Sequence, residues 1–141
     1  MAAPVILVTG STEGIGRAVV RKLATSDAEV IVHGRDGAKG RETTREIKRL
    51  TWNRNIDLVI ADLSIQEEVR RMAEEIRSRY NRLSVLINNA GTYERERVLS
   101  PDTIEVTLAV NYLAPFLLTH ELLPLLEKGA PSRVVTVASI A

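Results

Sequence analysis

The chain has 141 residues, of which 45% are hydrophobic and 26% are charged, a formal net charge of +1 and no cysteine. This balance gives no electrostatic reason to expect nucleic-acid or membrane binding, and the absence of cysteine excludes a disulfide framework, a thiol nucleophile and a cysteine zinc site. No apolar run approaches membrane-spanning length and the first strand starts close to Met1, so we expect one cytoplasmic domain over residues 1–141.

Apolar strands alternate with amphipathic helices along the chain, which predicts an α/β fold with a doubly wound parallel sheet. The predicted strands cover residues 5–8, 29–33, 56–61, 84–88 and 133–138. The predicted helices cover residues 15–26, 37–50, 65–80 and 101–127. Right-handed crossovers give the strand order 3-2-1-4-5, and a ligand crevice is expected at the carboxyl ends of the strands, between the first and the fourth.

Three side chains have predicted structural roles. Ser64 is expected to cap the helix over 65–80, and Trp52 is expected to cover an edge of the core. Pro115 has no N–H group, so the carbonyl of Asn111 should lose its helical partner and the long helix should kink there.

The first strand leads into a strand-to-helix turn with three glycines, in the segment Thr9-Gly10-Ser11-Thr12-Glu13-Gly14-Ile15-Gly16. Such a turn lets backbone N–H groups approach a pyrophosphate closely, with the positive end of the helix aimed at it. Gly10 is expected to permit the tight turn, Gly14 to leave room for phosphates, and Gly16 to let the helix pack on the strand. A purely structural turn is the alternative interpretation.

Polar or small residues follow each predicted strand at the same edge of the sheet: Gly10, Arg35, Asp62, Asn89 and Ser139. Core packing does not explain this convergence.

Arg35 lies about 20 residues beyond the glycine turn, where an acid would bind the adenosine ribose and an arginine accommodates a 2′-phosphate. The sequence therefore favours NADP over NAD as a cofactor, with a solvated loop charge as the alternative interpretation of Arg35.

The motif T-G-x-x-x-G-I-G over residues 9–16 and the tetrapeptide Asn-Asn-Ala-Gly over 88–91 resemble hallmarks of the short-chain dehydrogenase/reductase family. The resemblance covers essentially the whole chain, and the stretches 33–36 and 110–119 look most like the retinol-dehydrogenase-like branch. It implies a Rossmann-type fold and hydride transfer between a nicotinamide cofactor and a small carbonyl or alcohol substrate.

The same resemblance implies a set of cofactor-binding residues, namely Gly10, Ser11, Thr12, Gly14, Ile15, Gly16, Arg35, Asp62, Leu63, Asn89, Ala90, Gly91 and Val110. In the family an aspartate such as Asp62 contacts the adenine amine; helix capping is the alternative role here. Asn88 is expected to be mainly structural. Glu13 departs from the basic residue that some NADP-preferring members carry in this turn.

Two catalytic residues are also implied by the resemblance. Ser139 would hydrogen-bond the substrate carbonyl, and the main-chain carbonyl of Asn111 would hold a water in a proton relay. A serine that merely closes a strand and an asparagine that merely faces solvent are the alternatives. His33 and His120 lack cysteines or paired carboxylates at ligand spacing, so no metal site is predicted.

The family's general acid, a tyrosine followed four residues later by a lysine, has no match in this sequence. The residues at that spacing are Ser84 after Tyr80, Arg97 after Tyr93 and Phe116 after Tyr112. We therefore expect a fragment of the family's fold, truncated after the fifth strand, that binds NADP but is inactive alone. A non-catalytic dinucleotide-binding module is the alternative.

Truncation there would leave the fifth strand as a sheet edge and expose the apolar face of the helix over 101–127. Such edges and patches favour pairing with another chain. Subunits of the family also commonly dimerise through that helix. We therefore expect a homo-oligomer.

Overall fold

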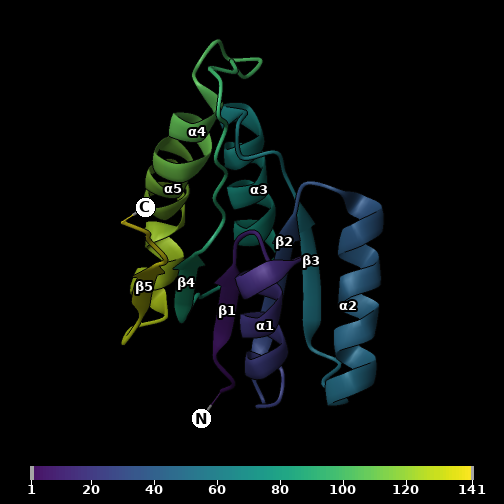
Figure 1. Cartoon of the computed structure of the whole chain (residues 1–141). Coiled ribbons are helices and arrows are strands. Elements are labelled where there is room, and N and C mark those ends of the chain that lie inside the picture. Colours follow the sequence, from purple (N-terminus) through teal and green to yellow (C-terminus); the bar gives the residue numbers. More distant parts are fainter. Residues whose placement is uncertain (1, 141) are drawn as a thin grey trace.

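A parallel sheet with helices on both faces forms the centre of the computed structural model, which describes residues 2–140 (Figure 1). Its strands are β1 (Val5–Val8), β2 (Glu29–Gly34), β3 (Ile56–Ile60), β4 (Val85–Asn88) and β5 (Arg133–Thr136). The helices are α1 (Gly14–Leu23), α2 (Gly37–Thr51), α3 (Gln66–Arg79), α4 (Val106–Leu108), the π-helix η1 (Ala109–Leu113) and α5 (Ala114–Lys128). The observed order β3-β2-β1-β4-β5 confirms the predicted topology and places the switch point between β1 and β4.

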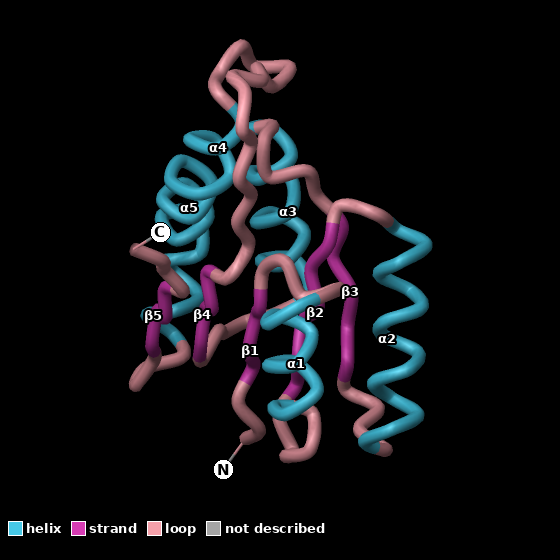
Figure 2. The backbone as a smooth tube through the Cα atoms, in the orientation of Figure 1, coloured by secondary structure: helices cyan, strands magenta, loops and turns pink. Residues whose placement is uncertain are grey.

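Two hydrophobic cores lie on opposite faces of the sheet, because successive side chains of a strand point to opposite sides. Val5 and Leu7 of β1 join a cluster with residues of α3 and α5. Ile6 and Val8 join a second cluster with residues of α1 and α2. Figure 2 shows the strands in one layer between these helices. Burial on both faces explains why β1 is a continuous apolar run without alternation.

β5 is the exposed edge of the sheet, as predicted. It pairs with β4 on one side only, and all of its residues are exposed. The apolar side chains Val134 and Val135 keep 46% and 42% of their surface in contact with solvent. The edge therefore combines unpaired backbone groups with apolar side chains.

The long helix begins later than predicted. It starts at Val106 instead of Pro101, because Glu105 caps it, accepting hydrogen bonds from the N–H groups of Thr107 and Leu108. Asp102 instead accepts from the N–H of Gln66 at 2.8 Å, at the start of α3. Asp102, which lies in the first turn of the helix predicted over 101–127, therefore caps α3 instead.

The predicted kink takes the form of a π-helical turn, η1. The N–H of Ala114 donates to the carbonyl of Ala109, five residues earlier, one residue further back than in an α-helix. Pro115, which follows directly, has no N–H to donate. The irregular turn accordingly lies where the sequence places Asn111 before a proline.

α4, η1 and α5 form one continuous helical segment of 23 residues, Val106–Lys128, with a mean hydropathy of 1.3 over its most apolar 18 residues. It is long and apolar enough to cross a membrane by length and composition, so the expectation that no apolar run approaches that length is wrong. One such helix is weak evidence for a span, because core helices of soluble proteins pass the same test. Here one face packs on α3 through Leu118 and Leu122, while Tyr112 and Phe116 are exposed.

Two helix ends differ from the sequence prediction. α1 ends at Leu23, because the hydroxyl of Thr25 donates to a carbonyl in the last turn. Ser64 does not cap α3, whose N-cap residue is Ile65. The Ser64 hydroxyl instead donates to Asp62 at 2.7 Å, so the serine is part of a turn that precedes the helix.

Trp52 does not cover the core, contrary to prediction. It is the residue that terminates α2, with a left-handed φ of 60° and its N–H bonded to the carbonyl of Lys48. The side chain is 90% exposed. The backbone reversal at the end of α2 directs the indole into solvent, at the edge of the sheet where the strands begin.

Candidate functional site

The glycine turn between β1 and α1 is packed directly against the loop after β4. Gly10 has a φ of +60°, and a Cβ on it would lie 2.8 Å from the Cα of Ala90. A Cβ on Gly16 would lie 2.2 Å from the carbonyl oxygen of Gly10 and 2.5 Å from Nδ2 of Asn89. No side chain larger than hydrogen fits at either position without moving backbone.

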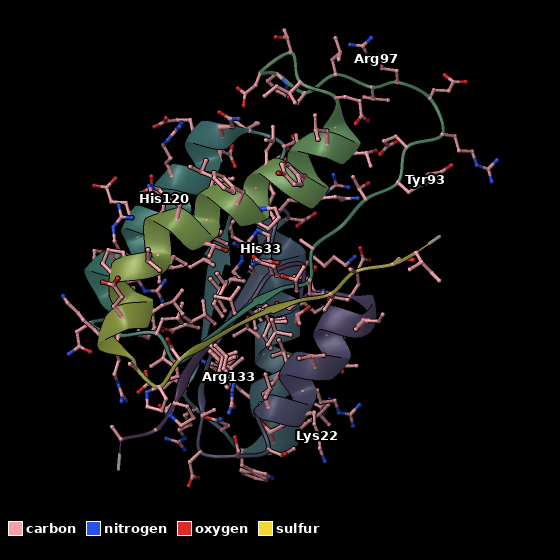
Figure 3. The ribbon with its side chains drawn as sticks, turned by 90° about the vertical axis from the view of Figure 1, so that its left-hand side faces the viewer. Lys22, His33, Tyr93, Arg97, His120 and Arg133 are labelled. Carbon is pink, nitrogen blue, oxygen red and sulfur yellow. The ribbon has the colours of Figure 1, made fainter. Side chains whose placement is uncertain are left out.

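His33, near the end of β2, holds the same turn from the other side. Its ring is buried; Nδ1 accepts a hydrogen bond from the N–H of Gly10 at 2.9 Å, and Nε2 lies 3.0 Å from the carbonyl oxygen of Ala61. Since Nδ1 accepts, the neutral ring carries its proton on Nε2 and donates to Ala61. Burial lowers the pKa of His33, against the opposing effect of the Ala61 carbonyl. Figure 3 shows the ring inside the molecule.

Asn89 joins the end of β4 to the glycine turn. Its Nδ2 donates to the carbonyls of Thr9 and Gly10, both at 3.1 Å. The hydroxyl oxygen of Thr9 accepts in return from the N–H groups of Asn89 and Ala90, both at 3.0 Å. Side-chain bonds from β2 and β4 therefore fix the turn on both flanks.

A cleft of about 630 Å³ opens at the carboxyl ends of the strands, over the switch point. Most of the predicted cofactor-binding residues line it, namely Gly10, Thr12, Ile15, Gly16, Arg35, Asp62, Leu63, Asn89, Ala90, Gly91 and Val110. Its wall also includes His33 and Glu13, which the sequence did not assign to it. The structure thus brings together residues that are spread over about 100 positions of the chain.

Four predicted site residues lie outside the lining of this cleft. Ser11 is fully buried, and its hydroxyl donates to the carbonyl of Val8 at 2.8 Å. Gly14 is exposed at the first position of α1. Asn111 is exposed in η1, and Ser139 is exposed three residues beyond the end of β5. None of the four is among the described residues that wall the cleft.

Asp62 serves the turn that precedes α3. Its Oδ1 accepts from the N–H of Ser64 at 2.9 Å and from the Ser64 hydroxyl, and its own N–H donates to Glu68 at 2.6 Å. The turn holds Asp62 and Leu63 in the cleft wall. Asp62 thus closes a turn before α3 and does not cap the helix, whose N-cap residue is Ile65, and its contact with adenine stays a prediction.

Asn111 holds the loop that follows β4, a role that the sequence did not indicate. Its Oδ1 accepts from the N–H of Thr92 and its Nδ2 donates to the Thr92 carbonyl, each at 2.8 Å. Thr92 lines the cleft. The side chain of Asn111 therefore positions one wall of the cleft, although Asn111 itself does not line the cleft.

None of the tyrosines in the described part of the chain lines the cleft. Tyr80 donates from its hydroxyl to Asp57 at the opposite edge of the sheet, and burial together with that carboxylate raises the pKa of Tyr80. Tyr93 is 81% exposed on the loop after β4, visible at the right of Figure 3, and Tyr112 is 64% exposed in η1. The geometry therefore assigns no proton donor among them.

Only one signal could have indicated His33 from the sequence. A polar residue near the end of an otherwise apolar strand, followed by Gly34, is unusual at a position that becomes buried. Its two hydrogen-bond partners, Gly10 and Ala61, follow the ends of β1 and β3, so the tertiary fold alone identifies them.

Comparison with known proteins finds relatives over nearly the whole chain. The family profile described as short chain dehydrogenase matches residues 4–141. Retinol dehydrogenase 12 of Bos taurus and retinol dehydrogenase 11 of Homo sapiens are each 39% identical over 137 residues, which cover 97% of this chain and 43% of the relative. Dehydrogenase/reductase SDR family member 12 of Homo sapiens is 39% identical over 135 residues, 96% of this chain and 42% of the relative. The chain thus spans less than half the length of these relatives.

Solved structures give the same result for the fold. A metagenomic short-chain oxidoreductase in complex with NADP is 30% identical with a TM-score of 0.84, covering 98% of this chain and 63% of that one. The Pseudomonas aeruginosa RhlG/NADP active-site complex is 29% identical with a TM-score of 0.83, covering 99% of this chain and 56% of that one. Both structures contain NADP according to their descriptions.

Proposed function

Since this chain belongs to the short-chain dehydrogenase family, we propose that it forms the NADP-binding part of an oxidoreductase that acts on a carbonyl or alcohol substrate. The observation that carries the proposal is the backbone cradle at the start of α1. Gly10 and Gly16 of this cradle leave no room for a Cβ, hydrogen bonds from β2 and from the residue after β4 fix it, and it opens into the cleft. When bound, the nicotinamide would accept or donate a hydride.

The residues of the cleft fit such a dinucleotide. The glycine turn and the start of α1 would hold the pyrophosphate, because unpaired backbone N–H groups and the helix dipole favour an anion there. The first turn of α1 has no acidic side chain, and the carboxylate of Glu13, the N-cap residue, is paired with Lys39. We propose that Asp62 and Leu63 border the adenine, and that Asn89 and Gly91 border a ribose.

We propose NADP over NAD because of Arg35. This residue is exposed at the end of β2, lines the cleft and takes part in none of the ion pairs of the described residues. A guanidinium in this position suits a 2′-phosphate, which it can bind through two parallel hydrogen bonds. The NADP in the two structural relatives supports the same assignment.

A binding titration tests the proposal. NADPH and NADH are titrated against the chain and against Arg35→Asp, with Kd measured by calorimetry and folding by circular dichroism. NADPH should bind more tightly than NADH, and the variant should lose about tenfold in NADPH affinity, because it replaces a charge-assisted bond with repulsion. Equal affinities in both proteins would refute the NADP assignment, and no binding by a folded chain would refute the function.

Ser139 and Asn111 are proposed as the catalytic residues of the reaction. Ser139 follows β5 at the same edge as the cleft, and Asn111 lies in η1, where Pro115 cannot donate to the Asn111 carbonyl. Ser139→Ala, made in an active protein that contains this chain, should lower kcat strongly with an unchanged Kd for NADPH. A parallel loss of NADPH binding would count against a role in chemistry.

A non-catalytic dinucleotide-binding module is the second candidate. It is favoured by one observation, namely that neither of the proposed catalytic residues, Ser139 and Asn111, lines the cleft. In that case the chain binds NADPH but does not oxidise it in the presence of aliphatic or aromatic aldehydes. Turnover that Ser139→Ala abolishes would exclude the module.

A further inference from the structure

The ring of His33 connects two loops that line the cleft. Nδ1 accepts a hydrogen bond from the N–H of Gly10 at 2.9 Å, and Nε2 lies 3.0 Å from the carbonyl oxygen of Ala61. Gly10 follows β1, Ala61 follows β3, and both line the cleft together with His33. The ring therefore fixes the glycine turn relative to the loop after β3, the segments proposed to hold the pyrophosphate and the adenine.

The two contacts of the ring respond differently to protonation. Nε2 carries a proton both in this neutral tautomer and in the imidazolium, so the bond to Ala61 survives. Nδ1 accepts only in the neutral ring, and once protonated it directs a second N–H at the N–H of Gly10. A proton on the ring therefore breaks the contact with the glycine turn and keeps the other.

The remaining bonds around the turn do not depend on the ring. The backbone N–H of His33 donates to the hydroxyl of Ser11 at 3.0 Å, and the N–H of Ser11 donates to the His33 carbonyl at 2.9 Å. Asn89 holds the carbonyls of Thr9 and Gly10 from the other flank. Loss of the ring contact should therefore distort the turn locally and leave the sheet assembled.

The charges around the ring leave it neutral at neutral pH. Burial lowers the pKa of His33 and outweighs the opposing effects of the Ala61 carbonyl and of Asp62. Glu68, at the start of α3, accepts from the N–H of Asp62. Four charged side chains line the cleft together with the ring, namely Glu13, Arg35, Asp62 and Glu94.

We propose that His33 is a positioning residue for the dinucleotide: its neutral ring holds the N–H of Gly10 and with it the shape of the phosphate cradle, so affinity falls when the ring takes up a proton. The inference rests on the proposed function. It concerns the pyrophosphate, which NADPH and NADH share, so the binding of both should weaken at low pH.

The first test measures Kd for NADH and NADPH by calorimetry in the whole chain. The pH is lowered from 7.5 to the lowest value at which circular dichroism shows a folded chain. Both Kd values should be constant above about pH 6.5 and rise below it, by up to about tenfold per pH unit, the limit for one proton. NADH is the more informative ligand, because it lacks the 2′-phosphate, which itself titrates near about pH 6.

Two variants separate the two contacts of the ring. In His33→Asn the side-chain oxygen can take the place of Nδ1 and accept from Gly10, whereas in His33→Gln the amide nitrogen can take the place of Nε2 and donate to Ala61. His33→Asn should keep the Kd for NADH within about threefold at pH 7.5 and should remove its rise at lower pH. His33→Gln should raise that Kd about tenfold at pH 7.5, because the N–H of Gly10 loses its acceptor.

His120→Gln, at the exposed second histidine, is the matched control and should keep the pH dependence of the original chain. The inference is overturned if the Kd for NADH stays constant or falls as a folded chain is acidified, or if His33→Asn and His33→Gln weaken binding equally. In those cases the proposed function stands. If the folded chain binds neither dinucleotide at pH 7.5, the proposed function fails and the inference fails with it.

Discussion

The backbone N–H of Gly10 donates to Nδ1 of His33 at 2.9 Å, so a glycine with positive φ depends on a buried, neutral imidazole. The other ring nitrogen donates to Ala61, and the His33 backbone exchanges hydrogen bonds with Ser11. One residue therefore joins the ends of three neighbouring strands beside the cleft. A proton on Nδ1 would remove the acceptor that Gly10 uses.

The stability of the chain should therefore fall as the pH is lowered. An unfolded histidine titrates at about pH 6.5, and the folded pKa of His33 is lower, so the unfolded state binds more protons below that pH. The contribution of the neutral ring is complete above about pH 6.5 and is lost as the pH falls toward the folded pKa.

Urea unfolding at several pH values between 5 and 7.5 measures this effect. His33→Gln should lower the slope of the free energy of unfolding against pH by up to about 1.4 kcal/mol per pH unit. This is the slope that results when the unfolded state binds one proton more than the folded state. His120→Gln, at the exposed second histidine, is the control and should keep the slope of the original chain. The same slope in the original chain and in His33→Gln would contradict the role of the ring.

Gly16→Ala should abolish dinucleotide binding and destabilise the fold. The added methyl would lie 2.2 Å from the carbonyl oxygen of Gly10, so the turn or α1 must move, at a cost of about 1–3 kcal/mol. Calorimetry with NADPH and thermal unfolding measure the two effects. In the control Gly37→Ala the new methyl meets only the mobile guanidinium of Arg41, at 3.0 Å, so the melting temperature should not fall. Tight NADPH binding by Gly16→Ala would show that the cradle is not the phosphate site.

Asn111→Leu should loosen the loop that follows β4. The variant loses both 2.8 Å hydrogen bonds to the backbone of Thr92, and each exposed bond contributes about 1 kcal/mol. Hydrogen exchange at the Thr92 amide should accelerate by about thirtyfold, the factor that corresponds to about 2 kcal/mol. Asn81→Leu, at an exposed position near the opposite edge of the sheet, provides the comparison. Unchanged protection of Thr92 would mean that the loop is held by other contacts.

Self-association should depend on β5. Sedimentation velocity is expected to show concentration-dependent oligomers, because β5 presents an unpaired edge with exposed valines. Val135→Lys should shift the distribution toward monomer, since a charge on an edge strand opposes pairing. Leu50→Lys, at a 39% exposed position on α2, is the control. A monomer at every concentration would refute the prediction.

The sheet could be predicted from the sequence because residues adjacent in the chain mark each strand and turn, and several such signals agree. β1 is an apolar run bounded by a glycine turn, and right-handed crossovers then leave few arrangements for the other strands. Most of the cleft residues could also be predicted, because they follow the strands and parallel strands bring their carboxyl ends to one edge of the sheet.

What the sequence could not predict depends on partners distant in the chain. Ser64 looks like a cap, but Asp62 takes its hydroxyl and Asp102, from far along the chain, caps α3. The pairing of Glu13 with Lys39 and the clamp from Asn111 to Thr92 likewise join separate elements. A large apolar side chain favours a core position for Trp52. The left-handed backbone of Trp52 at the end of α2 directs the indole into solvent instead.

The position of Trp52 decides how ligand binding can be observed. It is the single tryptophan of the sequence, it is 90% exposed, and it ends α2 at the edge of the sheet remote from the cleft. Its emission is therefore that of a solvated indole that no ring bound in the cleft would contact. Intrinsic fluorescence should report unfolding poorly, whereas a dye attached at residue 52 would label the chain and leave its binding surface intact.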